Sequence, residues 1–313
     1  MKTLLFCFVF SMLSFGGYSS PLHYTLNLHF KDKIHHKVVL QSIKGNQLTL
    51  LKDFREMNKN GHYSFPENLA VGMYRILFST TNTAREAKYI DFIFNNEDIA
   101  FATDIEAPMD SLNVISSEEN RIWFSFKRME AEFQQHLKEL DIEIDLFRKH
   151  GITDPAARLE FEDRAVKYNQ MQRDRDEFIV QIIHDHSSLY AARLIAVYRE
   201  PILDGLKMRE ERKTIYKNDF FKYFEPRDET LINSQIYTDK VYKYLMNYSQ
   251  RGLTPEQQEN EFIQATDSLL VHCKQNETIH VFISDYLVSF SKRLNYSRLN
   301  TFLVEKKSCI PNQ

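Results

Sequence analysis

The hydrophobic residues of this chain change their spacing once, between Ile115 and Trp123. Before this point apolar and polar residues alternate, which is typical of half-buried β-strands. After it, apolar residues recur at three- and four-residue steps, as they do along one face of an α-helix. The pattern predicts an α+β protein in which the strands come first and the helices follow. It says little about chemistry, because alternating strands and amphipathic helices specify a fold and not a function.

Residues 21–116 are expected to form an antiparallel β domain. The alternation is strictest in residues 22–30. Residues 44–46 (KGN) are a turn, and residues 60–61 (NG) are typical of a hairpin. Many short strands at this spacing favour a β-sandwich or a partly open barrel. The other expected strands cover residues 38–43, 48–51, 63–65, 74–78, 89–94, 99–102 and 112–115.

Residues 117–313 are expected to form an all-helical domain. Ser116 and Glu119 make a capping box for its first helix, and Gly151 is placed to end that helix. Asp154 and Pro155 then supply an N-cap and a first-turn proline, so a long antiparallel helix hairpin is predicted. Further helices are expected at residues 188–199, 231–249, 255–273 (after the capping box TPEQ at 254–257), 278–294 and 297–307.

Residues 1–20 have the composition of a signal peptide. Lys2 provides a positive start, residues 3–15 form an apolar run, and small residues recur between Gly16 and Ser20. Cleavage is expected near Ser19 or Ser20. The apolar run is too short for a membrane span, and no later run approaches ~18 apolar residues. The sequence therefore predicts a soluble exported protein, periplasmic or extracellular.

The charge balance argues against nucleic acid as a partner. The 313 residues include 40 Lys and Arg and 43 Asp and Glu, a formal net charge of -3. Nucleic-acid binding needs a basic face that neutralises phosphates. The sequence also contains no GxSxG, P-loop or GxGxxG motif. No cofactor and no enzymatic activity are predicted, and the expected partner is a protein.

Two groups of histidines are weak candidates for metal binding. His184-Asp185-His186 contains suitable ligand types, but residues two apart on a helix face different directions. A helix terminus is therefore the favoured interpretation, and no metal site is predicted. The same holds for four histidines on the wet face of the first strands, where a solvated face is favoured: His23, His29, His35 and His36.

Two charged segments are interpreted as solvated surface. Asp141, Glu143 and Asp145 alternate along the first helix. Paired carboxylates can carry out acid-base catalysis, but these three spread around the helix circumference. They are assigned to its solvated side. The mixed run at residues 209–213 (REERK) has the same interpretation.

Cys273 and Cys309 are the two cysteines that follow the signal peptide. In an exported protein they are candidates for a disulfide, but the sequence does not place them within bonding distance. Two unpaired thiols fit the sequence equally well. Neither cysteine lies in a CxxC pair, the usual mark of a redox-active dithiol. They remain the candidate disulfide or exchange thiols.

Several short motifs together resemble one bacterial protein family. Residues 22–307 are similar to the N-terminal domain of unknown function, plus the helical region, of exported TlpA-like thiol-disulfide interchange proteins of the thioredoxin family. In that family a thioredoxin domain with a CxxC motif follows, and here it is absent. Ser116 also stands where the family pattern has glycine. The motifs are residues 60–65 (NGHYSF), 72–76 (GMYRI), 91–99 (DFIFNNEDI), 116–120 (SSEEN), 178–194 and 220–245.

Two functional hypotheses follow from this resemblance. The first is a non-enzymatic exported scaffold or interaction protein, which keeps only the supporting segments of such a redox protein. The second is a redox-pathway participant in which Cys273 or Cys309 exchanges disulfides with a separate thioredoxin-like protein. The first is favoured, because the scaffold segments occur without a dithiol motif. Its partner would be a thioredoxin-like protein or a second copy of this chain.

Overall fold

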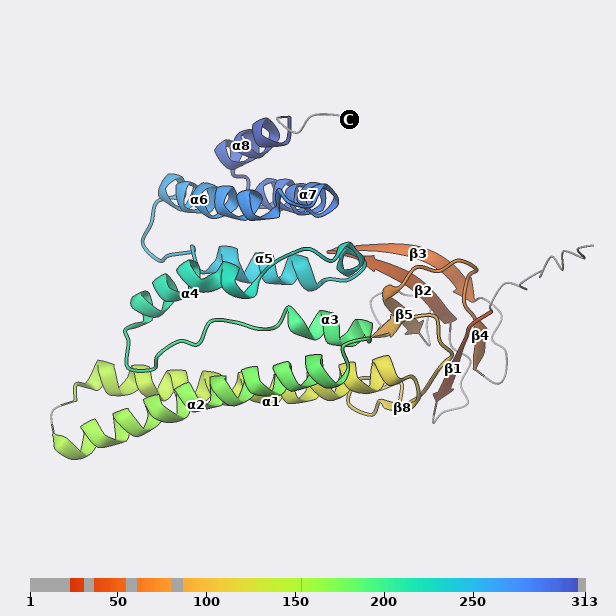
Figure 1. Ribbon diagram of the computed structural model, residues 1–313, viewed down its shortest axis with the longest axis horizontal. Helices are drawn as coiled ribbons and strands as arrows, with labels where there is room; N and C mark the ends of the chain where they lie inside the picture. Colours follow the sequence, from red (N-terminus) through yellow and green to blue (C-terminus); the bar gives the residue numbers. More distant parts are fainter. Residues whose placement is uncertain (1–22, 31–36, 55–60, 80–86, 153, 309–313) are drawn as a thin grey trace, which may run out of the picture.

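The computed structural model describes residues 23–30, 37–54, 61–79, 87–152 and 154–308. Within them, two four-stranded sheets are followed by a stack of helices (Figure 1). This is the α+β architecture that the change in hydrophobic spacing predicts. The strands are β1 (Thr25–Phe30), β2 (Lys37–Lys44), β3 (Gln47–Phe54), β4 (His62–Ser64), β5 (Gly72–Ser79), β6 (Lys88–Phe94), β7 (Ile99–Thr103) and β8 (Asn113–Ser116).

The two sheets form an open sandwich. One has the strand order β4-β1-β7-β8 and the other β3-β2-β5-β6. Aromatic rings join their inner faces: the ring centroids of Phe92 in β6 and Phe101 in β7 lie 6.0 Å apart, edge to face. Of the two architectures expected, the sandwich is the one that forms, because the sheets do not close into a barrel.

One strand pairing differs from the antiparallel domain expected. β1 runs antiparallel to β4 but parallel to β7, with Leu26 opposite Ile99. Side chains alternate between the two faces of a strand in either direction, so alternation alone does not distinguish the pairings. A parallel pair needs a long connection, and here β2 to β6 lie between the two partners in sequence.

The described strands on either side of residues 60–61 do not pair as the expected hairpin would require. The strands on either side, β3 and β4, belong to different sheets. Asn60 lies outside the described residues, but Gly61 has a φ of 64° and its carbonyl accepts the N–H of Leu28 at 2.7 Å. A Cβ on Gly61 would lie 2.0 Å from the Leu28 carbonyl oxygen. Glycine is required there for close approach to β1 as well as for its backbone conformation.

The predicted helix hairpin is confirmed by α1 (Glu118–His150) and α2 (Pro155–Asp185). Gly151 ends α1 with a φ of 81°. The Asp154 carboxylate accepts the N–H groups of Ala156 and Ala157, each at 2.9 Å, and so caps α2. The two helices share a small apolar core around Ile144 and Phe161.

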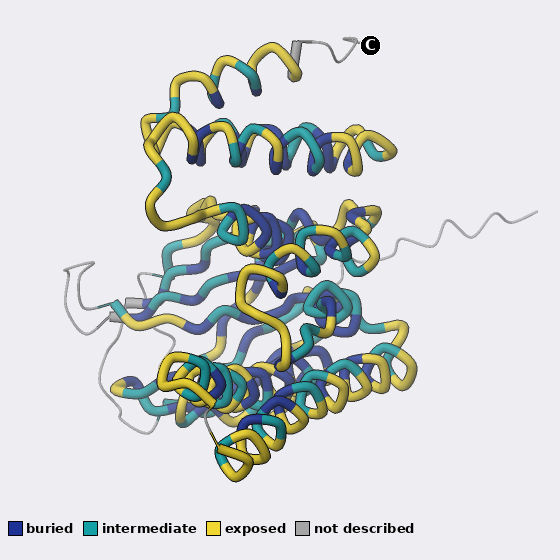
Figure 2. The backbone as a smooth tube through the Cα atoms, turned by 90° about the vertical axis from the view of Figure 1, so that its left-hand side faces the viewer, coloured by how far each residue is buried: buried dark blue, intermediate teal, exposed yellow. Residues whose placement is uncertain are grey.

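The later helices stack on this hairpin in layers, and buried residues face the neighbouring layer (Figures 1 and 2). Three of them agree closely with the expected ranges. The helix expected at 231–249 is divided in two, and one helix, α4, was not expected. The bounds are α3 (Tyr190–Ala196), α4 (Arg209–Tyr223), the 3-10 helix η2 (Glu229–Ile232), α5 (Ile236–Met246), α6 (Pro255–Cys273), α7 (Glu277–Arg293) and α8 (Ser297–Ser308).

The cap of α1 lies one residue later than the capping box expected at Ser116 and Glu119. The Ser117 hydroxyl accepts the N–H of Asn120 at 3.0 Å and donates to Glu97. Ser117 has a φ of 125°, which non-glycine residues rarely adopt. Glu119 takes no part in this cap. Its carboxylate instead accepts the N–H groups at the start of α3, from Tyr190 at 2.9 Å and Ala191 at 2.7 Å.

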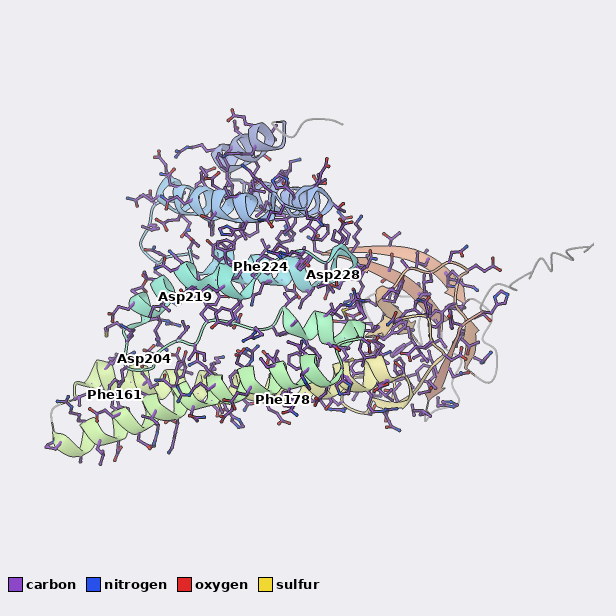
Figure 3. All side chains as sticks on the ribbon, in the orientation of Figure 1. Phe161, Phe178, Asp204, Asp219, Phe224 and Asp228 are labelled. Atoms are coloured by element: carbon purple, nitrogen blue, oxygen red, sulfur yellow. The ribbon has the colours of Figure 1, made fainter. Side chains whose placement is uncertain are left out.

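Backbone hydrogen bonds join the sandwich to the helices. The N–H of Met73 donates to the carbonyl of Asn233 at 2.7 Å, and that of Gly45 donates to Ser234 at 2.9 Å. Gly72 lies so close to Asn233 that a Cβ would sit 2.6 Å from the Asn233 side chain. Beside this contact, Asp228 (labelled in Figure 3) caps η2. Most buried apolar residues of both parts form one continuous cluster, which is separate from the small core between α1 and α2.

Asn120 should be a major determinant of stability. It is fully buried, and its amide pairs with both backbone groups of Ile93, at 2.8 Å to the N–H and 2.7 Å to the carbonyl. Replacement Asn120→Ala leaves two buried backbone groups without partners, so we expect a loss of about 2–4 kcal/mol in the free energy of unfolding.

Urea unfolding followed by circular dichroism measures this loss. The matched control is Asn113→Ala, because Asn113 is exposed on β8, and it should change stability by less than about 0.5 kcal/mol. Equal effects of the two substitutions would contradict the assignment.

Candidate functional site

The candidate thiol Cys273 lies at the end of α6 and is buried. Burial raises the pKa of this thiol to about 12, whereas disulfide exchange needs a thiolate near neutral pH. Among the described residues Cys273 has no disulfide partner, and Cys309 lies outside them. A bond between the two stays a prediction. The burial of Cys273 does not favour an exchange role.

The histidine cluster lies at a helix terminus, as interpreted from its spacing. α2 ends at Asp185, His186 is its C-cap, and the His184 Nδ1 atom lies 2.9 Å from the Asp185 Oδ1 atom. No group of three or more His, Cys, Asp and Glu side chains is placed to hold a metal within the described part of the chain. Of the N-terminal histidines, His23 and His29 are exposed, and His35 and His36 lie outside the described residues.

The acidic alternation of α1 is solvated only in part: the Glu143 and Asp145 side chains are 48% and 39% exposed, whereas that of Asp141 is 26% exposed. The Asp141 carboxylate lies 2.6 Å from the Arg212 guanidinium, and Asp145 lies 3.9 Å from it. Glu143 pairs with Arg164 of α2 at 2.6 Å. Arg212 belongs to the mixed charge run at 209–213, yet its side chain is only 5% exposed. The reason is α4, the helix that was not expected, which carries Arg212 onto α1.

A groove runs along α1 between the β-sandwich and α5. It consists of an outer cavity of about 460 Å³ and an inner cavity of about 350 Å³. Both are lined by Lys127, Tyr198, Ile236 and Asp239, so they adjoin each other; together we call them the α1 groove. Other lining residues are Met73, Tyr89, Met109, Trp123, Glu130, Gln134, Arg175, Glu200, Lys240 and Lys243.

The outer end of the α1 groove is aromatic. Trp123, the single tryptophan of the chain, packs edge to face against Tyr198 with ring centroids 6.2 Å apart. The Lys127 ammonium lies 5.6 Å from the Trp123 ring centroid and 5.3 Å from that of Tyr198. It also donates to the Tyr198 hydroxyl at 3.0 Å. These rings therefore already accommodate a cation.

Asp239 differs from the other charged residues of the α1 groove. It lies in the first turn of α5 and lines both cavities, where it is accessible to solvent. The surrounding protein partly desolvates its carboxylate and raises the pKa, although the charge of Lys127 acts in the opposite direction. No hydrogen bond or ion pair joins its carboxylate to another described residue.

The inner end of the α1 groove rests on a buried ion pair between α1 and α2. Arg175 binds Glu130 through two hydrogen bonds of 2.7 and 2.8 Å. Their side chains are 6% and 9% exposed. Arg175 also donates to the carbonyl of Tyr198 at 3.0 Å. Three of the elements around this end, α1, α2 and the segment after α3, are thereby held together.

A second buried charge cluster lies beside the first. Burial disfavours the ionised form of Glu200, but Lys243 and Lys240 outweigh this effect and lower its pKa to about 2. Burial lowers the pKa of Lys240 to about 8, and Glu200 only partly offsets it. The Lys240 ammonium donates to the carbonyl of Arg199 at 2.6 Å. Glu200 and Lys240, whose pKa values are both strongly shifted, thus form an ion pair with each other.

Sequence reasoning did not single out these groove residues. Glu130 and Arg175 are charged residues in helical stretches that also contain apolar residues. This is only a weak indication that their side chains are buried. Lys240 lies in one of the motifs on which the family resemblance rests. Its burial depends on how α5 packs, so the sequence pattern alone does not reveal it.

Comparison with known proteins returns neither a matching family model nor a matching curated protein. The resemblance to TlpA-like proteins accordingly stays a prediction. Within the described residues, no helix is both long and apolar enough to span a membrane.

Lys240 should make stability depend on pH above neutrality. Its pKa is about 8 in the folded protein and 10.5 ordinarily. Between these values the unfolded chain holds a proton that the folded chain has released, so the contribution of this group to stability rises with pH. We expect the stability of the wild type relative to Lys240→Met to increase by about 1–3 kcal/mol from pH 8 to pH 10.5.

Urea unfolding of both proteins at several pH values tests this expectation. The control is Lys292→Met, since Lys292 is exposed at the end of α7. The stability of the wild type relative to this variant should not change with pH. A wild-type advantage over Lys240→Met that falls or does not change with pH would refute the assignment.

Proposed function

We propose that this protein is a non-enzymatic interaction scaffold that holds a segment of a partner protein in the α1 groove. The observation that carries the proposal is the composition of the groove walls. Residues of the sandwich, such as Met73 and Tyr89, and residues of α1 and α5 line one opening. Both parts of the fold would therefore contribute to one binding surface.

The charges of the inner groove support binding over catalysis. A catalytic acid, base or nucleophile must reach the substrate with its reacting atom. Glu130 and Arg175 are buried and hydrogen-bonded to each other, and Lys240 is buried against Arg199 and Glu200. These groups hold the helices in place. Catalytic reduction of a disulfide substrate by the purified protein would contradict the proposal.

Photo-crosslinking in cells tests whether the groove binds a protein. The photoreactive amino acid p-benzoylphenylalanine replaces Met109, which lines the outer cavity and is 45% exposed. We expect an adduct with one discrete protein at this position. After purification, that protein should also shield Trp123 from quenching by acrylamide, because Trp123 lines the same cavity.

The matched control places the same amino acid at Leu159, which is 69% exposed on α2 and does not line the groove. Adducts of equal yield at both positions would indicate non-specific contact and would refute the groove as the binding site. An adduct at residue 109 that leaves Trp123 as accessible as before would do the same.

We also propose that the protein is exported to the periplasm or the extracellular space and that it is related to the non-catalytic part of TlpA-like proteins. Both proposals rest on the sequence, with residues 1–20 as the signal peptide. We expect the exported protein to begin within one or two residues of Ser20. N-terminal sequencing measures this directly, and an intact Met1 in the exported fraction would contradict it.

A further inference from the structure

We propose that Asp239 binds the lysine or arginine side chain of a protein segment that enters the α1 groove. This inference rests on the proposed function and names the chemistry of the partner. Asp239 lines both cavities of the groove, and no ion pair joins its carboxylate to another described residue, although the charge of Lys127 acts on it. Because this carboxylate is exposed on the groove wall, an entering cation can reach it and form a charge-assisted hydrogen bond with it.

The walls beside Asp239 suit the long stem of such a side chain. Lysine and arginine carry three or four methylene groups below their charge, and these groups pack well on apolar and aromatic surfaces. Trp123 and Tyr198 form one wall and Ile236 lies next to Asp239. An entering side chain can place its stem on the rings and its charge on the carboxylate.

The position of Lys127 shows that a cation can lie over the Trp123 and Tyr198 rings. Its ammonium lies over both rings and, among the described residues, has only the Tyr198 hydroxyl as a hydrogen-bond partner. Because Lys127 is exposed, it can turn into solvent when a second cation enters. Lys127 is then a competitor of the ligand, and its removal should strengthen binding.

The other charges around the groove do not favour an acidic segment. Arg175 is neutralised by Glu130, and Lys240 and Lys243 share Glu200. Lys88 lines only the outer cavity, whereas Asp239 lines both. Preferential binding of an acidic peptide is accordingly an outcome that would overturn the inference.

The experiment compares three peptides that differ in one side chain: acetyl-Leu-Lys-Leu-amide, its norleucine counterpart, and acetyl-Leu-Glu-Leu-amide. Calorimetry on the full chain measures affinity, and the emission of Trp123 reports whether binding occurs in the groove. We expect the lysine peptide to bind about tenfold more tightly than the norleucine peptide, as for a hydrogen bond to a charged group. The glutamate peptide should bind most weakly.

Three variants assign this preference to the residues named. Asp239→Asn should reduce the preference for lysine to less than about twofold. Asp239→Glu should retain most of the preference because it keeps the charge, and circular dichroism checks that both variants fold. Lys127→Met should bind the lysine peptide more tightly than the wild type does.

Each result either supports or overturns the inference. It is overturned if the lysine peptide binds at no soluble concentration, if the three peptides bind equally, or if Asp239→Asn keeps the preference for lysine. The scaffold proposal fails separately, when crosslinking at residue 109 yields no protein that shields Trp123. A groove that crosslinks a partner but does not prefer lysine would leave the scaffold and remove the role of Asp239.

Discussion

The first turn of α1 makes the contacts on which the arrangement of the rest depends. Asn120 pairs with both backbone groups of Ile93 in β6, the last strand of its sheet. Glu119 accepts the first two N–H groups of α3. Both side chains are buried, and without them these backbone groups would lack partners. One helical turn therefore joins a sheet edge to the start of α3, and the α1 groove lies beside these elements.

Buried ion pairs determine how far apart the helices lie along the inner groove. A guanidinium–carboxylate pair has a narrow range of geometry, so the Glu130–Arg175 pair sets the separation of α1 and α2 more tightly than exchangeable apolar side chains would. Lys240 does the same between α5 and the carbonyl of Arg199. Such pairs add little net stability compared with apolar packing, but loss of one partner is costly. Their contribution here is the shape of the groove.

How much could be predicted depends on whether the deciding interaction is local. The helix caps at Asp154 and Thr254 form as predicted, because a cap involves residues only two or three positions apart. The direction of β1 relative to β7 depends on distant segments and could not be predicted. α4 was not predicted for a different reason. Its buried residues are Arg212, Tyr216 and Phe220, so an arginine occupies one of the three positions where an apolar residue is expected. The residues of the candidate site could not be predicted either, because tertiary packing decides which charged side chains are buried.

Asp239 and Lys240 are adjacent residues of α5, but tertiary packing gives their side chains different exposure and different partners. Successive residues point about 100° apart, so α5 buries Lys240 and leaves Asp239 exposed, although both residues line the inner cavity. Lys240 has a carbonyl and a carboxylate as partners, whereas Asp239 is partly desolvated without any described partner. Asp239 is exposed and forms no ion pair with another described residue, so its carboxylate does not hold the helices together. A charge that is left open on the wall of the groove is better explained by binding than by folding.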